Sequence, residues 1–409
     1  GSMRQWRLAP NNIQRCSVAF FFNYLVSGLI GPFMSPLLLA QGFSHGQVSL
    51  IVAGSNVCCT IMPLVAGRIA ENYQQTRRVV AAASVLMLLA SVCLWLVVSF
   101  RERHPHSSPL LFVGCFLALS LCRAPLGSLL DSVAMQVSRS RPGSYGRIRM
   151  CGSLAFAVAA SAAGYTLGDG HLRRFFPALC LLAALTTVMA HVLPEERRDR
   201  PRQASDRAGF WRSLRRPFWF FIAATMLHWC AFSPYQYGFS LYLQEQAFSS
   251  RVTGALWSLA VLAEVVCFAL CPLVLRTIRP YHALGLAFAA SGVRWMLLGT
   301  APALPTIVVA QLLHGPGFAL YISAALQILS STAGGRFSSS FQGLYATMVS
   351  GLAACVGTLV AGFVHSRAPF HTVLAWMAPL ELVALLVLWV GHRAAVVDSS
   401  LPKLSTGQG

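Results

Sequence analysis

The sequence predicts an all-α membrane protein with twelve transmembrane helices arranged as two six-helix bundles. Of its 409 residues, 56% are hydrophobic and 11% are charged, whereas about 25% of the residues of a soluble globular domain are charged. Mean hydropathy is +0.61. The apolar residues form twelve runs, each close to the ~20 residues that cross a bilayer as a helix. A charged segment separates the first six runs from the last six.

The twelve runs follow one another with short polar connections. The first run is too long for the core of a signal peptide and lacks a small-residue cleavage site, so we expect it to remain as the first helix. Pro32 and Pro36 in that run, and Pro316 in the tenth, predict bends. The runs cover residues 16–40, 47–66, 79–100, 110–136, 148–168, 175–193, 218–243, 252–274, 281–299, 304–328, 340–364 and 371–391.

The distribution of Lys and Arg predicts that both termini are cytoplasmic. If the N-terminus is inside, 23 of the 31 Lys and Arg residues fall on the cytoplasmic side and 6 on the other side, which is the bias that cytoplasmic loops show. Arg123 and Arg294 lie within predicted helices. The net charge of +19 therefore reflects membrane topology, and we expect no nucleic-acid partner. The predicted location is the bacterial inner membrane, crossed many times.

The charged segment at the midpoint predicts the domain organisation. Residues 1–193 form an N-terminal bundle, residues 194–217 a charged cytoplasmic linker, and residues 218–409 a C-terminal bundle with a short cytoplasmic tail. This layout is typical of two-halved secondary transporters. Residues 210–216 of the linker are interpreted as a short helix on the inner leaflet, and a solvated linker is an equally good interpretation of residues 195–208.

The sequence lacks the patterns of an enzyme or a metal protein. Its twelve cysteines are scattered within apolar runs, with no CxxC pair, and are interpreted as small packing residues. No HExxH, GxSxG or nucleotide-binding loop occurs. We therefore expect no catalytic residue, no metal and no cofactor, with a proton gradient as the energy source.

The loop between the second and third runs resembles the cytoplasmic loop motif of the major facilitator superfamily. The residues that carry this likeness are Gly67, Arg68, Glu71, Arg77 and Arg78, with Glu71 in place of the usual Asp. The resemblance implies a gating role for this loop.

Longer stretches resemble particular members of that superfamily. Residues 124–150 resemble lactose permease without a gap. Residues 218–365 look more like the phenylpropionate-permease branch of the same proton-symporter group, through segments such as Tyr237–Leu243 and Gln311–Gly315. The likeness covers nearly the whole chain. It implies the major facilitator fold, alternating access and a monomer.

Four ionisable residues within the apolar runs are candidates for proton coupling. Such residues are costly in a bilayer and mark functional sites. The resemblance places Glu264, Arg294 and His314 where lactose permease keeps its proton-coupling residues. Burial favours a protonated carboxyl and a nearby guanidinium favours the carboxylate, so movement of Arg294 relative to Glu264 would load or release a proton. A static buried network is the alternative. Gly317 replaces a second acid of lactose permease, which leaves Glu264 or Asp131 as the proton carrier.

The predicted substrate site lies in the N-terminal half. Asp131 in the fourth run and Arg149 near the start of the fifth are expected to meet. The resemblance implies that this pair holds substrate, and an ion pair that gates the cytoplasmic side is the alternative. Phe156 stands where sugar-transporting relatives have a Trp. Arg123, in the middle of the fourth run, is a natural partner for a substrate carboxylate. The alternatives are that it pairs with a group on the seventh or eighth helix, or that its side chain snorkels towards the membrane surface.

Aromatic and polar side chains at helical spacing are predicted to complete the substrate site. Three of them form one stripe along the seventh helix, although helix packing explains such stripes more often than ligand binding does. The candidates are His228, Phe232 and Tyr235 in the seventh helix, Trp257 in the eighth and Asn23 in the first.

These observations together predict a proton-coupled importer of a small organic solute. An aromatic or amphipathic carboxylate is favoured because Arg123 adds a positive charge, while Phe156 and Cys267 replace hydrogen-bonding groups of the sugar permease. A glycoside or nucleoside importer and a proton-antiport exporter of amphipathic compounds are the alternatives. The expected partners are a small-molecule substrate, protons and the lipid bilayer.

Overall fold

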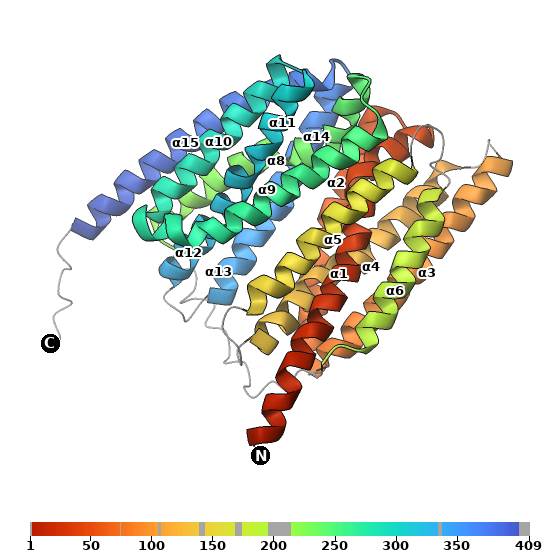
Figure 1. The fold of residues 1–409 in the computed structure, drawn as a ribbon. Coiled ribbons are helices and arrows are strands. Elements are labelled where there is room, and N and C mark those ends of the chain that lie inside the picture. The colour runs from red at the N-terminus through yellow and green to blue at the C-terminus, as the bar shows by residue number, and fades with distance from the viewer. Residues whose placement is uncertain are drawn as a thin grey trace.

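The computed structural model describes residues 2–73, 75–104, 108–138, 144–167, 174–194, 214–333 and 338–400, and every regular element within these ranges is a helix. The chain forms two groups of helices that lie side by side (Figure 1). The predicted linker 194–217 falls almost entirely outside the described residues.

The first group contains six helices. They are joined by short connections, and α1 runs without interruption through Pro32 and Pro36. The helices are α1 (Ser2–Ala40), α2 (His45–Tyr73), α3 (Thr76–Arg103), α4 (Pro109–Ser138), α5 (Ser144–Thr166) and α6 (Phe175–His191).

The second group contains two interrupted helices. A π-helical segment, η2 (Pro316–Leu320), follows His314, and a second one, η3 (Ala346–Ala353), divides the next span. A proline removes a backbone donor and crowds the preceding turn, which explains the interruption that begins at Pro316. The α-helices are α8 (Arg216–Glu245), α9 (Ser250–Thr277), α10 (Pro280–Thr300), α11 (Leu304–Leu312), α12 (Tyr321–Ala333), α13 (Ser338–Tyr345), α14 (Ala354–His365) and α15 (Phe370–Ser400).

The helical segments account for the predicted apolar runs to different degrees. Ten helical segments of the described chain are long and apolar enough to cross a membrane. The helix α6 is apolar but has 17 residues, fewer than the ~20 of a full span. The helix α8 has 30 residues, among them two Trp, three Tyr and one His. Most of its side chains are buried by neighbouring helices, so it needs less apolar surface of its own.

Packing follows the two groups. The helix α1 packs along α5, and α4 packs against α2 and α3; in the second group, α15 packs along α8 and α10. The two groups meet through α5 with α9 and through α2 with α14.

The molecule has two distinct ends. The end at which α1 begins and α15 ends, together with residues 75 and 278–279, is called here the terminal end (Figure 1). The opposite end, which carries the connections 41–44, 246–249 and 366–369, is called the distal end. The first and last described helices therefore begin and end, respectively, at the same end of the molecule.

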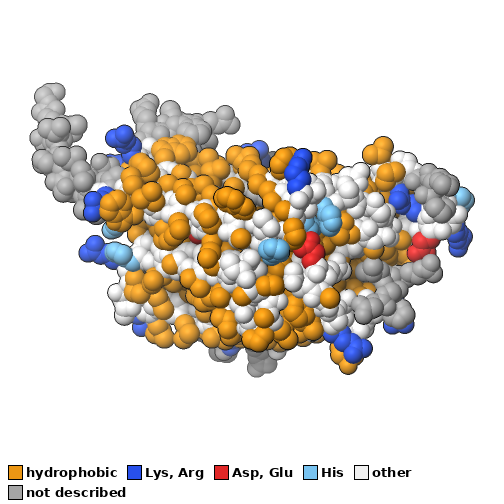
Figure 2. Space-filling view, turned by 90° about the horizontal axis from the view of Figure 1, so that it is seen from above, with side chains coloured by type: hydrophobic (Ala, Val, Ile, Leu, Met, Phe, Trp, Pro, Cys, Tyr) orange, Lys and Arg blue, Asp and Glu red, His pale blue; other side chains and the backbone are white. Residues whose placement is uncertain are grey.

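Large apolar side chains cover the outer surface. Leu110, Leu382 and Trp376 are each at least 66% exposed. Figure 2 shows hydrophobic side chains over most of the visible face, with Lys and Arg towards its margins. A surface of this kind matches the hydrocarbon of a bilayer, because lipid tails are as apolar as these side chains.

Candidate functional site

A cavity of about 300 Å³ lies between the two groups of helices. Residues of α1, α2, α4 and α5 line one side of it and residues of α8, α9 and α14 line the other. The polar and aromatic lining residues include Ser27, Ser35, Ser55, Asn56, Phe116, Ser120, Arg123 and Phe156 from the first group, and Ser233, Gln236, Tyr237, Trp257 and Thr358 from the second.

Arg123 carries the one charge among the described residues that line this cavity. Its Nη1 donates to the Ser27 hydroxyl at 3.4 Å, and no carboxylate of the described chain pairs with it. The sequence analysis left open a partner on the seventh or eighth helix, and the described helices supply none. The guanidinium therefore retains donors for an anionic ligand.

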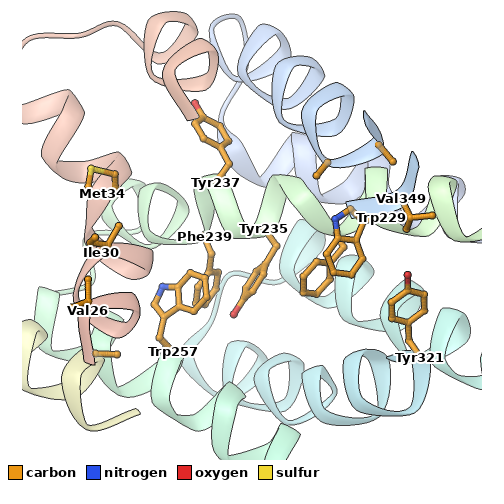
Figure 3. Packing of buried hydrophobic residues seen from close by; sticks show 14 of the residues in the cluster. Val26, Ile30, Met34, Trp229, Tyr235, Tyr237, Phe239, Trp257, Tyr321 and Val349 are labelled. Atoms are coloured by element: carbon orange, nitrogen blue, oxygen red, sulfur yellow. The ribbon is translucent and has the colours of Figure 1, made fainter. Parts of the chain in front are cut away.

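Two predicted aromatic residues line the same cavity as Arg123. The rings of Phe156 and Trp257 lie 6.4 Å apart between centroids. The Trp257 indole donates to the Ser240 hydroxyl at 2.9 Å, which fixes its ring. Figure 3 shows Trp257 beside Phe239, on the side of α8 that faces Val26 of α1. The cavity thus combines one cation with ring-sized apolar surface.

Asp131 and Arg149 meet as the sequence analysis expected, outside the lining of the cavity. Arg149 Nη1 lies 3.7 Å from Asp131 Oδ1, and the Tyr145 hydroxyl donates to the same oxygen at 3.1 Å. Arg149 also donates to the Tyr24 hydroxyl. Their helices α4 and α5 carry this group close to the terminal end.

Glu264 pairs with His314 rather than with Arg294. The distance from His314 Nε2 to Glu264 Oε2 is 3.5 Å. Arg294 instead donates through Nε to the Ala310 carbonyl at 3.1 Å and through Nη2 to Gln311 Oε1 at 2.9 Å. These three predicted proton-coupling residues thus lie in one region, but the guanidinium contacts neutral oxygens.

Opposite charges lie on the two helices through which the groups of helices meet. Glu264 lies on α9 and Arg149 on α5, and these two helices pack directly against each other. Glu264 is paired with His314 in the second group, and Arg149 is paired with Asp131 in the first.

The predicted stripe on α8 points into the second group of helices instead of the cavity. His228 is fully buried, and its Nδ1 lies 2.9 Å from the carboxylate oxygens of Glu381. Phe232 stacks on His314 at 5.7 Å. The Tyr235 hydroxyl accepts from Gln311 Nε2 at 3.0 Å. These side chains pack between α8 and its neighbouring helices. The spacing in the sequence alone could not distinguish such packing from ligand binding.

The remaining predicted residues lie away from the cavity. Asn23 is buried, and its backbone carbonyl accepts from the Ser27 hydroxyl at 3.4 Å. Gly67, Arg68 and Glu71 belong to the last turns of α2, and the side chain of Glu71 is outside the described residues. Arg77 and Arg78 begin α3, where Arg78 Nη1 donates to Gln75 Oε1 at 2.9 Å.

Direct contacts between the two groups of helices bound the cavity towards the distal end. The Ser35 hydroxyl donates to the Tyr237 carbonyl at 2.6 Å, and the Ser161 and Ser258 hydroxyls lie 2.7 Å apart. Gly164 and Gly254 allow α5 and α9 to approach until a Cβ on either would meet the facing backbone. Small residues of this kind permit close helix packing in membranes.

Several polar residues of the cavity were not among the residues predicted from the sequence. They include Asn56, Ser120, Gln236 and Thr358. An amide within an apolar run is an available signal for Asn56 and Gln236, because it is costly to place against lipid. Among the described residues, no group of three or more His, Cys, Asp or Glu side chains is placed to hold a metal ion.

Comparisons with a family model and with known proteins agree on the family to which the chain belongs. The model of the MFS_1 like family matches residues 13–375. The chain is 29% identical over 355 residues to a probable 3-phenylpropionic acid transporter of Escherichia coli (strain K12), covering 85% of this chain and 88% of that one. It is 25% identical over 372 residues to the maltose permease of Geobacillus stearothermophilus, covering 90% and 92%.

Solved structures show the same fold. The crystal structure of a variant of the nucleoside transporter NupG superposes with a TM-score of 0.80 at 14% identity, over 93% of this chain and 99% of that one. At this identity the likeness concerns the fold.

Proposed function

The chain belongs to the MFS_1 like family of the major facilitator superfamily, and on that premise we propose that this membrane transporter is a proton-coupled importer of a small aromatic or otherwise amphipathic carboxylate. It works by alternating access, with two bundles of six transmembrane helices that rock about the cavity. Both termini face the cytoplasm.

The environment of Arg123 is the main support for the proposed class of substrate. This guanidinium faces the cavity without a carboxylate partner in the described chain, and the lining beside it supplies Phe116, Phe156 and Trp257. A guanidinium without a carboxylate partner is suited to bind an anion, because it presents several N–H donors and a fixed positive charge. An aromatic carboxylate provides that anion together with a ring for the apolar walls. The relative named for 3-phenylpropionic acid agrees with this choice.

The opposite charges of Glu264 on α9 and Arg149 on α5, two helices that pack against each other, support proton coupling. A proton on Glu264 removes one of these charges and so changes the electrostatic balance between the two groups of helices. His314, 3.5 Å from Glu264, is placed to exchange that proton. Import follows if substrate and proton enter the site from the same side.

The distal contacts support a cytoplasm-facing conformation. Where described residues form hydrogen bonds between the two groups, they lie in the distal half of the helices, as in Ser35 with Tyr237 and Asn56 with Thr358. With cytoplasmic termini, the distal end faces outward. The cavity is then closed from outside.

Binding of a carboxylate and its amide to purified protein tests the proposed substrate class. We expect 3-phenylpropanoate to bind, 3-phenylpropanamide to bind far more weakly, and Arg123→Ala to remove most of the affinity for the carboxylate alone. Arg174→Ala, outside the cavity, is the matched control and is expected to leave binding unchanged. Equal losses for both ligands in Arg123→Ala, or tight binding of a neutral glycoside or nucleoside by the unmodified protein, would contradict the proposal.

A further inference from the structure

Most polar side chains of the cavity already have hydrogen-bond partners within the protein. The Ser55 and Ser120 hydroxyls lie 2.9 Å apart. Asn56 Nδ2 donates to the Thr358 hydroxyl at 3.2 Å, and the Tyr237 hydroxyl donates to the His45 carbonyl at 3.1 Å. These groups shape the wall of the cavity, and a ligand gains less from them because their donors are in use.

Gln236 differs from these residues. Gln236 is exposed, whereas all the remaining residues between 231 and 243 of α8 are buried. Because it lines the cavity, that exposure is towards the cavity. Its side-chain amide has no hydrogen-bond partner in the described chain. An amide offers two N–H donors and one carbonyl acceptor, all of which are free for a ligand.

Arg123 and Gln236 belong to opposite sides of the cavity. Arg123 lies on α4 in the first group of helices and Gln236 on α8 in the second. The apolar surface of Phe156 and Trp257 belongs to the same cavity. A ligand that fills this space without a polar group for Gln236 leaves the amide dry and unpaired, which weakens its binding.

We propose that Gln236 is a specificity-determining residue that binds a second polar group of the substrate. The substrate class is then an aromatic carboxylate that carries a hydrogen-bonding substituent, such as a hydroxyl, away from its carboxylate. This inference rests on the proposed function, because it assigns the carboxylate to Arg123. A ligand held at both points joins the two groups of helices, so it stabilises the conformation in which both points are close.

The test compares three anions by calorimetry on the full-length protein in lipid nanodiscs. The probes are 3-phenylpropanoate and its meta- and para-hydroxylated forms. We expect the unmodified protein to bind at least one hydroxylated form about tenfold more tightly than the parent. Gln236→Leu, which keeps the bulk and removes the amide, is expected to bring that ratio of affinities close to one.

A matched control separates the loss of the amide from a general effect. Gln327 on α12 is exposed and does not line the cavity, so Gln327→Leu is expected to retain the tenfold ratio. Thermal unfolding of each variant checks that it is folded.

The possible failures are distinguishable. If the parent anion binds with dependence on Arg123 but no hydroxylated form is preferred, or if Gln236→Leu keeps the preference, the role of Gln236 is wrong and the proposed function stands. If none of the three anions binds the folded, unmodified protein, the proposed carboxylate specificity is itself wrong.

Discussion

At the residue scale, the ionisable residues within apolar runs divide into those that face the cavity and those that hold the helices together. The sequence could predict that Arg123, Glu264, Arg294 and His314 matter, because each is costly in a bilayer. It could not predict which partner each would choose. Arg294 donates to the Ala310 carbonyl and to Gln311, a choice that depends on how α10 and α11 pack and not on sequence spacing.

Neutralising Glu264 tests its role as proton carrier. Glu264→Gln is expected to abolish accumulation driven by a pH gradient and to retain exchange of substrate across the membrane, because the cavity itself remains. Radiolabelled substrate in proteoliposomes measures both. Glu102→Gln, at the exposed distal end of α3, is the matched control. Continued accumulation by Glu264→Gln would transfer the proton role to Asp131.

The buried pair of His228 and Glu381 predicts a loss of stability. Both side chains are fully buried, and Glu381 Oε1 also accepts from the Trp295 indole at 3.1 Å. Leaving a buried hydrogen-bonding group without its partner costs about 1–3 kcal/mol. Glu381→Gln is therefore expected to lower the thermal unfolding temperature in detergent. Loss of uptake with an unchanged unfolding temperature would instead place Glu381 in the transport pathway.

At the element scale, hydropathy predicted the positions of the helices well, but it did not predict where the π-helical segments interrupt them. The connections between α1 and α2 and between α8 and α9 fall where the runs end. The start of η2 coincides with Pro316, a visible signal, whereas no proline lies within η3 (Ala346–Ala353). The stripe on α8 packs among neighbouring helices, the alternative that the sequence analysis gave beside ligand binding, since aromatic side chains pack between helices as readily as against a ligand.

The close contact of α5 with α9 predicts a conformational effect. A Cβ at Gly254 would meet the Ala160 carbonyl, so Gly254→Leu is expected to force the distal ends apart. Spin labels attached at Gln47 on α2 and Ser366 after α14, in a cysteine-free background, measure the separation. Gly114→Leu, where a Cβ meets nothing within 4 Å, is the control. An unchanged distance distribution in Gly254→Leu would contradict the role of this contact.

Histidines at the distal end predict a response to external pH. The rings of His45 on α2 and His365 on α14 lie 4.0 Å apart. His365 Nε2 lies 2.7 Å from Glu245 Oε1, and the Tyr237 hydroxyl donates to the His45 carbonyl. A positive charge on His45 in acid lies directly against the imidazole ring of His365 across the contact, and this added charge is expected to favour separation.

The same spin-label distance measures this response. We expect it to lengthen as the pH falls through the range in which histidines titrate. His45→Gln, which keeps a polar side chain without the charge, is expected to remove most of that dependence. A pH response of equal size in His45→Gln would show that other groups control the distal contact.

At the scale of the whole molecule, composition and charge distribution predicted an all-helical membrane protein, and family membership follows from a match over residues 13–375. The sequence already favoured an aromatic or amphipathic carboxylate through Arg123, but the lining of the cavity needed the structure, because it is built from residues far apart in the sequence, such as Arg123 and Gln236. No local pattern shows that these two residues line one cavity. The direction of transport also depends on the whole molecule and on its orientation in the membrane.

Accumulation in proteoliposomes tests the central claim most directly. Purified protein is reconstituted, 3-phenylpropanoate is supplied outside, and a pH gradient is imposed with the outside acidic and then reversed. Protein-free liposomes correct for unmediated permeation of the acid. The account predicts accumulation with the outside acidic, its collapse on addition of a protonophore, and no protein-dependent accumulation with the gradient reversed. Protein-dependent uptake that ignores the gradient, or accumulation with the reversed gradient alone, would contradict proton-coupled import.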